Sequence, residues 1–141
     1  MEARLEREAP VFTTTNAFSS FSVDDLDAAK KFYGETLGLG VTESEMGTID
    51  LALGGGATVF VYPKPDHQPA TFTVLNFDVD DLDKAVDELN ARGVTTKIYA
   101  DDEIPDMPND AKGITRDDEN SMAIAWFKDP AGNVIALMQT S

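Results

Sequence analysis

The stretch FSVDDLDAA, residues 21–29, occurs again almost unchanged as FDVDDLDKA at residues 77–85. The two copies agree at seven of nine positions and lie 56 residues apart. Each follows a run that is typical of a strand and continues into apolar residues at helical spacing. Self-similarity of this kind indicates that one supersecondary unit is present twice, so the duplication organises the whole chain.

Each copy contains the start of a predicted helix. The pairs Asp24/Asp25 and Asp80/Asp81 lie where a helix N-cap is expected, and there a carboxylate accepts a hydrogen bond from a free backbone N–H and complements the helix dipole. Apolar residues then recur at helical spacing over residues 26–37 and 82–89. Gly38 and Gly93 suit the C-terminal ends, where the chain often adopts a positive φ.

Three strands are expected after each helix. Alternating apolar residues, with glycine turns between them, predict strands at residues 40–46, 48–53 and 57–62, and again at residues 94–99, 121–127 and 134–139. Each half thus has the order strand–helix–strand–strand–strand. Neither half is long enough to be stable alone, so we expect one domain.

The domain divides by residue number. Residues 1–13 are an N-terminal extension and residues 14–141 form the single domain, with module 1 at 14–62, a linker at 63–70 and module 2 at 71–141. The acidic stretch 101–120, rich in Pro, Asp and Gly, is expected to be a loop. Its sequence is compatible with a lid over a pocket and with a plain surface excursion.

Composition excludes several function classes. The 141 residues include no cysteine, which removes disulfides, thiolate chemistry and zinc–sulfur sites. With 26 acidic and 11 basic side chains the formal net charge is −15, which disfavours binding to nucleic acid or anionic membranes. No apolar run approaches the roughly 20 residues that cross a bilayer, and the charged N-terminus is unlike a signal peptide. A cytoplasmic protein is therefore expected.

The order of these motifs resembles the vicinal oxygen chelate superfamily, which includes glyoxalases, extradiol dioxygenases, and fosfomycin- and bleomycin-resistance proteins. V-x-D-L opens each helix, A-x-x-F-Y lies within the first, and D-P-x-G-N precedes the last strand. The resemblance implies an α+β fold in which two tandem βαβββ modules curl into a mixed-sheet half-barrel, and it implies a homodimer. The residues that carry it are Val23, Asp25, Leu26, Ala29, Phe32, Tyr33, Leu37, Gly38, Val79, Asp81, Leu82, Asp129, Pro130, Gly132 and Asn133.

The same resemblance locates four metal-ligand positions, two on the first strands of the modules and two on the last. Here they hold Phe18, Val74, Phe60 and Ala136. Benzyl, isopropyl and methyl groups have no lone pair to donate, so we expect neither a metal nor another cofactor. A divalent metal stays the alternative if its ligands lie elsewhere.

Strand alternation predicts which side chains share a face with these four positions. The expected ligand-binding residues are mainly apolar and aromatic, with a few polar anchors. They are Phe18, Ser20, Phe60, Tyr62, Phe72, Val74, Asn76, Trp126, Ala136 and Met138. The pattern does not settle which face Trp126 shares. An apolar–aromatic lining with sparse polar groups is typical of small-molecule sites, although the same side chains fill packed cores equally well.

Other candidates carry less chemistry. His67, the only histidine, is expected at an exposed position in the linker, so no catalytic triad is predicted. Glu43, Glu45 and Asp50 are carboxylates near the expected pocket mouth, more typical of solvated strand positions than of a metal site.

Three functional hypotheses remain. The first is a metal-free small-molecule-binding protein of the bleomycin-resistance type, with no catalytic residue assigned. The second is a glyoxalase-like lyase, isomerase or dioxygenase with a nonstandard metal site. The third is an interaction protein whose cavity is filled. Whether the cup forms within one chain or across a homodimer stays open.

Overall fold

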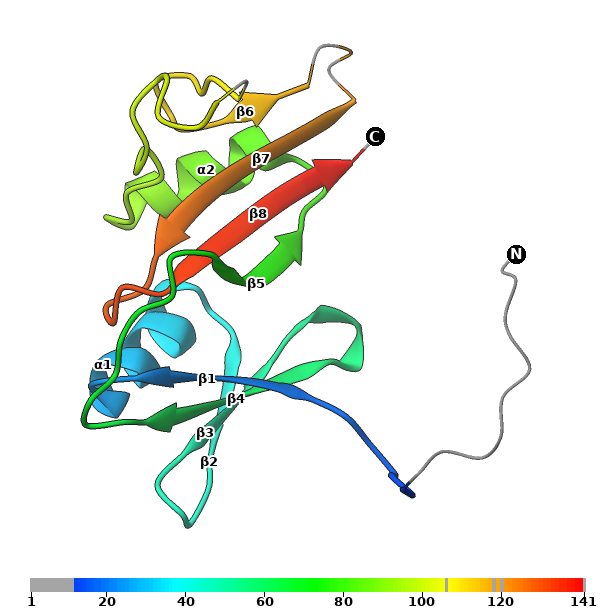
Figure 1. Cartoon of the computed structure of the whole chain (residues 1–141), viewed down its shortest axis with the longest axis vertical. Helices are drawn as coiled ribbons and strands as arrows, with labels where there is room; N and C mark the ends of the chain where they lie inside the picture. The colour runs from blue at the N-terminus through cyan, green and yellow to red at the C-terminus, as the bar shows by residue number, and fades with distance from the viewer. Residues whose placement is uncertain (1–11, 106, 118, 120, 141) are drawn as a thin grey trace.

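The chain folds into two four-stranded mixed sheets, each accompanied by helix (Figure 1). The structure is a computed structural model that describes residues 12–105, 107–117, 119 and 121–140. Most of the expected N-terminal extension lies outside the described residues. The elements of module 1 are β1 (Ser19–Val23), α1 (Leu26–Lys31), η1 (Phe32–Thr36), β2 (Gly40–Glu43), β3 (Ile49–Ala52), η2 (Gly54–Gly56) and β4 (Thr58–Pro63). Those of module 2 are β5 (Thr73–Asp78), α2 (Leu82–Ala91), β6 (Thr115–Arg116), β7 (Met122–Lys128) and β8 (Val134–Thr140).

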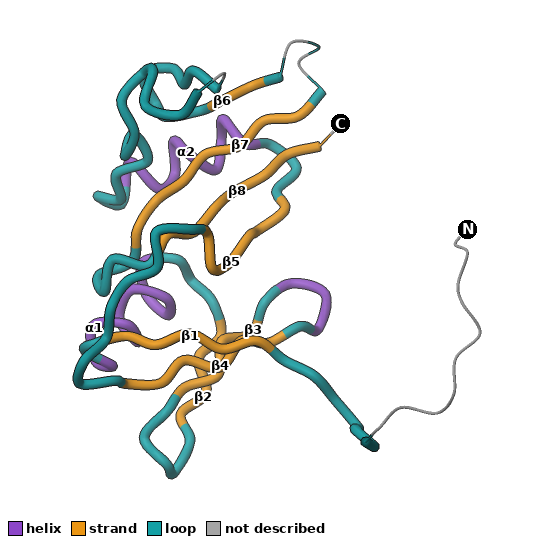
Figure 2. The backbone as a smooth tube through the Cα atoms, viewed as in Figure 1, coloured by secondary structure: helices purple, strands orange, loops and turns teal. Residues whose placement is uncertain are grey.

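The two sheets have the same topology. Sheet A has the order β1-β4-β3-β2 and sheet B the order β5-β8-β7-β6. In each, the first strand pairs in parallel with the last, and the other pairings are antiparallel. Figure 2 shows these strands as two separate groups with loops between them. The fold class of two βαβββ modules with curled, unclosed sheets is therefore confirmed.

Both helices begin as their sequences predict. The side chain of Asp25 accepts a hydrogen bond from the N–H of Ala28, and that of Asp81 accepts one from Lys84, each at 3.1 Å. Gly38 lies beyond the end of η1 with φ of 78°. The last turn of the first helix is widened into the π-helical η1, where the N–H of Leu37 donates to the carbonyl of Phe32.

One expected strand does not form. Residues 94–99 are irregular, and the short strand β6, from within the expected loop 101–120, takes the sheet edge beside β7. Side-chain hydrogen bonds, rather than a strand ladder, fix this irregular segment. The hydroxyl of Thr96 donates to the carbonyl of Lys112 at 2.8 Å, and the amide of Asn90 donates to Thr96 at 3.0 Å. The amide of Asn90 also donates to the backbone carbonyl of Val94 at 2.9 Å. The strand prediction for residues 94–99 was wrong because these side-chain bonds hold the segment in an irregular path that the alternating pattern does not encode.

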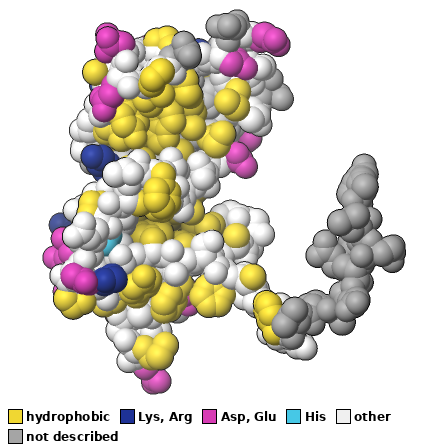
Figure 3. Space-filling view, viewed as in Figure 1, with side chains coloured by type: hydrophobic (Ala, Val, Ile, Leu, Met, Phe, Trp, Pro, Cys, Tyr) yellow, Lys and Arg dark blue, Asp and Glu magenta, His cyan; other side chains and the backbone are white. Residues whose placement is uncertain are grey.

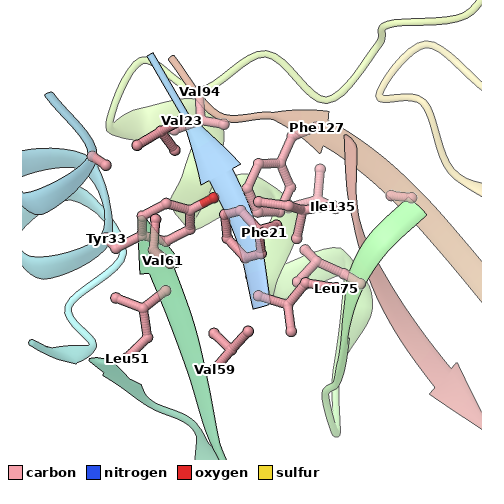
Figure 4. Close-up of a cluster of buried hydrophobic side chains, with 14 of the residues drawn as sticks. Phe21, Val23, Tyr33, Leu51, Val59, Val61, Leu75, Val94, Phe127 and Ile135 are labelled. Atoms are coloured by element: carbon pink, nitrogen blue, oxygen red, sulfur yellow. The ribbon is translucent and has the colours of Figure 1, made fainter. Parts of the chain in front are cut away.

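The two modules share one hydrophobic core. In Figure 4, Phe21, Val59 and Val61 from sheet A converge with Phe127 and Ile135 from sheet B. Aromatic rings from the first helix lie between the two sets, with the ring centroids of Phe32 and Phe127 6.2 Å apart. Each sheet therefore turns its helix-covered face toward the other module, and its opposite face points away from this core.

A buried polar cluster joins the modules at the edge of that core. Asp129, which is 5% exposed, accepts hydrogen bonds from the Tyr33 hydroxyl at 2.6 Å and from the backbone N–H groups of Ala131 and Asn133. The side-chain amide of Asn133 donates to Asp129 and to the carbonyl of Ser22. Burial, followed by the charge of Asp129, raises the pKa of Tyr33 well above its usual range, so its hydroxyl stays protonated as a donor.

Replacing the donor in this cluster is expected to destabilise the protein. Tyr33→Phe leaves the buried Asp129 carboxylate with one donor fewer, and the loss is about 1–3 kcal/mol of unfolding free energy. Urea denaturation followed by circular dichroism measures it. Tyr62→Phe is the matched control, because that hydroxyl belongs to the face of sheet A turned away from the core. Equal stability of the two variants would contradict the role of the Tyr33–Asp129 bond.

Candidate functional site

The face of sheet A that points away from the core, here called open face A, carries a row of aromatic rings. Ser20, Phe60 and Asp50 are in register across β1, β4 and β3. The ring of Phe60 packs edge-on against that of Phe18, with centroids 6.2 Å apart, and its centroid lies 6.1 Å from that of Tyr62. This row is the aromatic surface expected from the strand pattern, and Asp50 adds a carboxylate in register with Phe60.

The corresponding face of sheet B, open face B, is also apolar. Asn76, Ala136 and Trp126 are in register, and Met138 lies beside Ile124 in the next row. The structure thus settles the face of Trp126, which the sequence left open. In the view of Figure 3, hydrophobic side chains gather over β7 and β8 on the face opposite α2.

A bulge changes the contribution of β5 to open face B. Thr73 pairs with Val134 and Leu75 with Ile135, so two residues of β5 advance against one of β8. As a result Val74, expected on the site face, packs against the core cluster. Thr73 points its hydroxyl to Trp126 instead and accepts a hydrogen bond from the indole Nε1 at 3.1 Å.

The loop before β6 completes this surface. The ring of Tyr99 packs edge-on against Trp126, with centroids 5.4 Å apart. Sequence reasoning missed both Tyr99 and Thr73. No local signal marks them, because one lies on a segment expected to be a strand and the other depends on the bulge.

The expected site residues differ widely in exposure. Phe18 is 63% exposed and Phe72 69%, whereas Ala136 is fully buried beneath its neighbours. Phe60, Tyr62, Trp126 and Met138 are half-buried, and Ser20 and Asn76 are exposed. Because the sheets pack through their other faces, open faces A and B point outward from the shared core. Eight of the ten expected residues therefore belong to two separate surfaces of one chain, whereas Val74 packs against the core and Phe72 lies just before β5.

The family model of the Glyoxalase/Bleomycin resistance protein/Dioxygenase superfamily matches residues 16–137. The chain belongs to this superfamily. The match covers both modules, so the resemblance read from the repeated motifs is confirmed. A comparison with curated proteins finds no match.

Solved structures of this superfamily share the fold over nearly the whole chain. TnmS3, an antibiotic-binding protein from Streptomyces sp. CB03234, is 25% identical, with a TM-score of 0.60 and coverage of 92% of this chain and 100% of that one. A glyoxalase/dioxygenase from Nostoc punctiforme is 17% identical, with a TM-score of 0.65 and 99% of both chains covered. The fosfomycin resistance protein FosX from Listeria monocytogenes is 14% identical, with a TM-score of 0.63 and coverage of 92% of this chain and 96% of that one.

The residues present do not fit the metal that the superfamily implies. Phe18, Phe60, Val74 and Ala136 supply no donor atoms. Among the described residues, no three His, Cys, Asp or Glu side chains come together in a metal-binding group. Of the carboxylates considered near the pocket mouth, Glu43 pairs with Lys30 at 3.0 Å.

No helix in the described part of the chain is long and apolar enough to span a bilayer.

His67 is not the exposed linker residue that was expected. It is half-buried and lies between the modules, with Nδ1 2.6 Å from the Ser22 hydroxyl and Nε2 3.1 Å from the carbonyl oxygen of Ala131. The linker folds back onto the end of β1, where the N–H of Lys64 donates to the carbonyl of Val23. Sequence distance hid this contact, since Ser22 and His67 are 45 residues apart.

A separate groove lies between the two helical segments. It has a volume of about 330 Å³ and lies between the end of η1 and helix α2, with Leu37, Phe77 and Leu89 in its lining. The guanidinium of Arg92 crosses it and donates to the carbonyl of Thr36 at 2.7 Å. Sequence reasoning predicted none of these residues as a site, and their bonding links the modules.

The bond between Thr73 and Trp126 has an optical readout, because Trp126 is the only tryptophan. Thr73→Val removes the acceptor of the indole N–H and is expected to shift the fluorescence emission of the folded protein and cost about 1 kcal/mol of stability. Thr58→Val is the control, because Thr58 occupies an exposed position at the start of β4. An unchanged emission spectrum in Thr73→Val would contradict the bond.

Proposed function

We propose that this superfamily member is a metal-free small-molecule-binding protein whose apolar–aromatic cup is completed in a homodimer. The observation that carries the proposal is the aromatic row Phe18, Phe60 and Tyr62 on open face A. Two of its members, Phe18 and Phe60, occupy positions where the resemblance expects oxygen or nitrogen ligands of a metal. Such a surface binds through apolar area and ring stacking, and it offers no Lewis acid.

The charges on the open faces favour a cationic aromatic ligand. Asp50 lies in register with Phe60 on open face A, and Asp78 lies in register with Met138 on open face B. Both aspartates are exposed. A flat cation gains stacking on the rings and Coulomb attraction to these carboxylates, and the net charge of −15 attracts it from solution.

The known proteins support binding as a function of this fold. TnmS3 is an antibiotic-binding protein and FosX a fosfomycin resistance protein, and both match more than nine-tenths of the chain. We propose that this chain likewise binds an antibiotic-like small molecule.

The outward direction of the open faces supports the homodimer. In one chain these faces point away from a common core, and large apolar side chains such as Phe18 and Phe72 remain solvent-exposed. Exposed apolar groups of this size are typical of association surfaces. In the proposed dimer, open face B of one chain lies over open face A of the other. The aromatic row of open face A is then covered, and a site is enclosed between the two faces.

Ligand binding is expected to depend on Phe60 and not on metal. With proflavine, a flat aromatic cation, as the probe, Phe60→Ala should weaken binding about tenfold, since one buried stacking partner is lost. Quenching of Trp126 fluorescence measures the dissociation constant. Met46→Ala is the matched control, because Met46 is 80% exposed in the turn between β2 and β3 and belongs to no strand.

The metal content of the same preparation separates this proposal from a metal-dependent lyase, isomerase or dioxygenase. Binding should be unchanged after dialysis against EDTA, and native mass spectrometry should find no stoichiometric divalent ion. One bound ion per chain, or loss of binding after EDTA, would instead support the enzyme.

The homodimer has its own test in native mass spectrometry and sedimentation. We expect a species of twice the 15.3 kDa chain mass. Phe18→Glu should shift it toward monomer, because Phe18 packs on Phe60 of open face A and a charge buried in an apolar interface is costly without a partner. Met46→Glu, exposed elsewhere, should leave the dimer intact. A wild-type protein that is monomeric at micromolar concentration would overturn the assembly.

A further inference from the structure

The structure brings a hydroxyl nucleophile and a base together at one end of open face A. Ser22 lies on β1 between the buried residues Phe21 and Val23, so its side chain belongs to the opposite, open face. It is in register with Tyr62, the last ring of the aromatic row. His67, from the linker after β4, reaches it with an Nδ1···Oγ distance of 2.6 Å.

The histidine is held in the tautomer that a general base needs. A carbonyl oxygen only accepts hydrogen bonds, so the contact of Nε2 with the Ala131 carbonyl at 3.1 Å places the proton of the neutral imidazole on Nε2. The lone pair of Nδ1 then faces Ser22 and accepts the hydrogen bond from its hydroxyl. A nucleophile bonded to a base, which a third group orients, is the arrangement found in activated serine nucleophiles.

Both partners are fixed and reachable. The backbone carbonyl of Ser22 accepts a hydrogen bond from the Asn133 amide at 2.9 Å, and Asn133 is itself held by the buried Asp129. The turn that carries His67 is closed by its own N–H, which donates to the carbonyl of Lys64 at 3.0 Å. Ser22 and His67 are each half-buried, so the pair is ordered by its surroundings and still open to a small molecule.

We infer that Ser22 and His67 form a nucleophile–base pair that takes the acyl group of an activated ester or lactone held on open face A. This inference rests on the proposed function, because the aromatic row beside Ser22 is what binds the apolar part of such a molecule. Ring packing on Phe60 and Tyr62 brings the ester carbonyl to the Ser22 hydroxyl at the end of the row.

The step is redox-neutral and needs only the ester and water. The Ser22 oxygen forms a bond to the carbonyl carbon while Nδ1 of His67 takes the hydroxyl proton. The bond between the carbonyl carbon and the leaving oxygen breaks, and the leaving alcohol departs with that proton. Water then attacks the acyl-serine and gives its proton to His67, which returns it to Ser22, releasing the carboxylic acid.

The test uses p-nitrophenyl butyrate with the full-length protein. Nitrophenolate release gives the acylation rate, and intact mass followed by peptide mapping locates the butyryl group. We expect the adduct on Ser22, its absence in Ser22→Ala, and an acylation rate about a hundredfold lower in His67→Gln, since the base is removed. Ser19→Ala is the matched control, because Ser19 offers an exposed hydroxyl on β1 but shares its face with Phe21 and so lies outside the binding face.

Mapping of the wild-type adduct decides the inference even if a variant fails to fold. A folded wild-type protein that neither carries a butyryl group on Ser22 nor releases nitrophenolate above the uncatalysed rate would overturn the pair. A folded Ser22→Ala variant with the wild-type rate of nitrophenolate release would overturn it as well. Proflavine binding is measured on the same samples. If proflavine binds but neither sign of acylation is seen, only this inference fails. Modification of Ser22 without proflavine binding upholds the pair and counts against the proposed aromatic-cation ligand.

Discussion

The buried carboxylate of Asp129 is the interaction on which the arrangement of the two modules depends. It accepts bonds from Tyr33 in module 1 and from the turn between β7 and β8 in module 2. A buried charge is tolerated only where donors surround it, so these bonds allow little variation in how η1 packs against sheet B. Asn133 extends the constraint to β1 by donating to the Ser22 carbonyl.

This constraint determines which faces of the sheets are exposed. Because η1 is held between the sheets, the helix-covered faces share the core and the open faces point outward. The aromatic row of open face A and the Trp126–Tyr99 pair of open face B are thus surfaces of one chain and not the walls of one intramolecular cavity. The same constraint places the β7–β8 turn beside β1, where the carbonyl of Ala131 orients His67. The position of the aromatic row and the contact between Ser22 and His67 therefore both depend on how the modules pack.

Local sequence signals predicted the elements well where the cause was local. Asp25 and Asp81 cap their helices because a carboxylate three residues before a free N–H bonds it in almost any context. The signals failed at residues 94–99, where strand-like alternation gave way to bonds from Thr96 and Asn90. They also failed at Val74, because a bulge of one residue exchanges the two faces of a strand and leaves no mark in the alternation.

The sequence by itself determined the duplicated module, the superfamily and the apolar character of the four positions where a metal would bind. Each of these follows from residue type and spacing within one module, which short-range hydrogen bonding and side-chain periodicity control. Only the tertiary structure decided that Trp126 faces the site, that Thr73 takes the place of Val74, and that His67 meets Ser22. Those contacts join residues far apart in the chain, and they form only when two sheets and a folded-back linker pack on a common core, which no local pattern encodes.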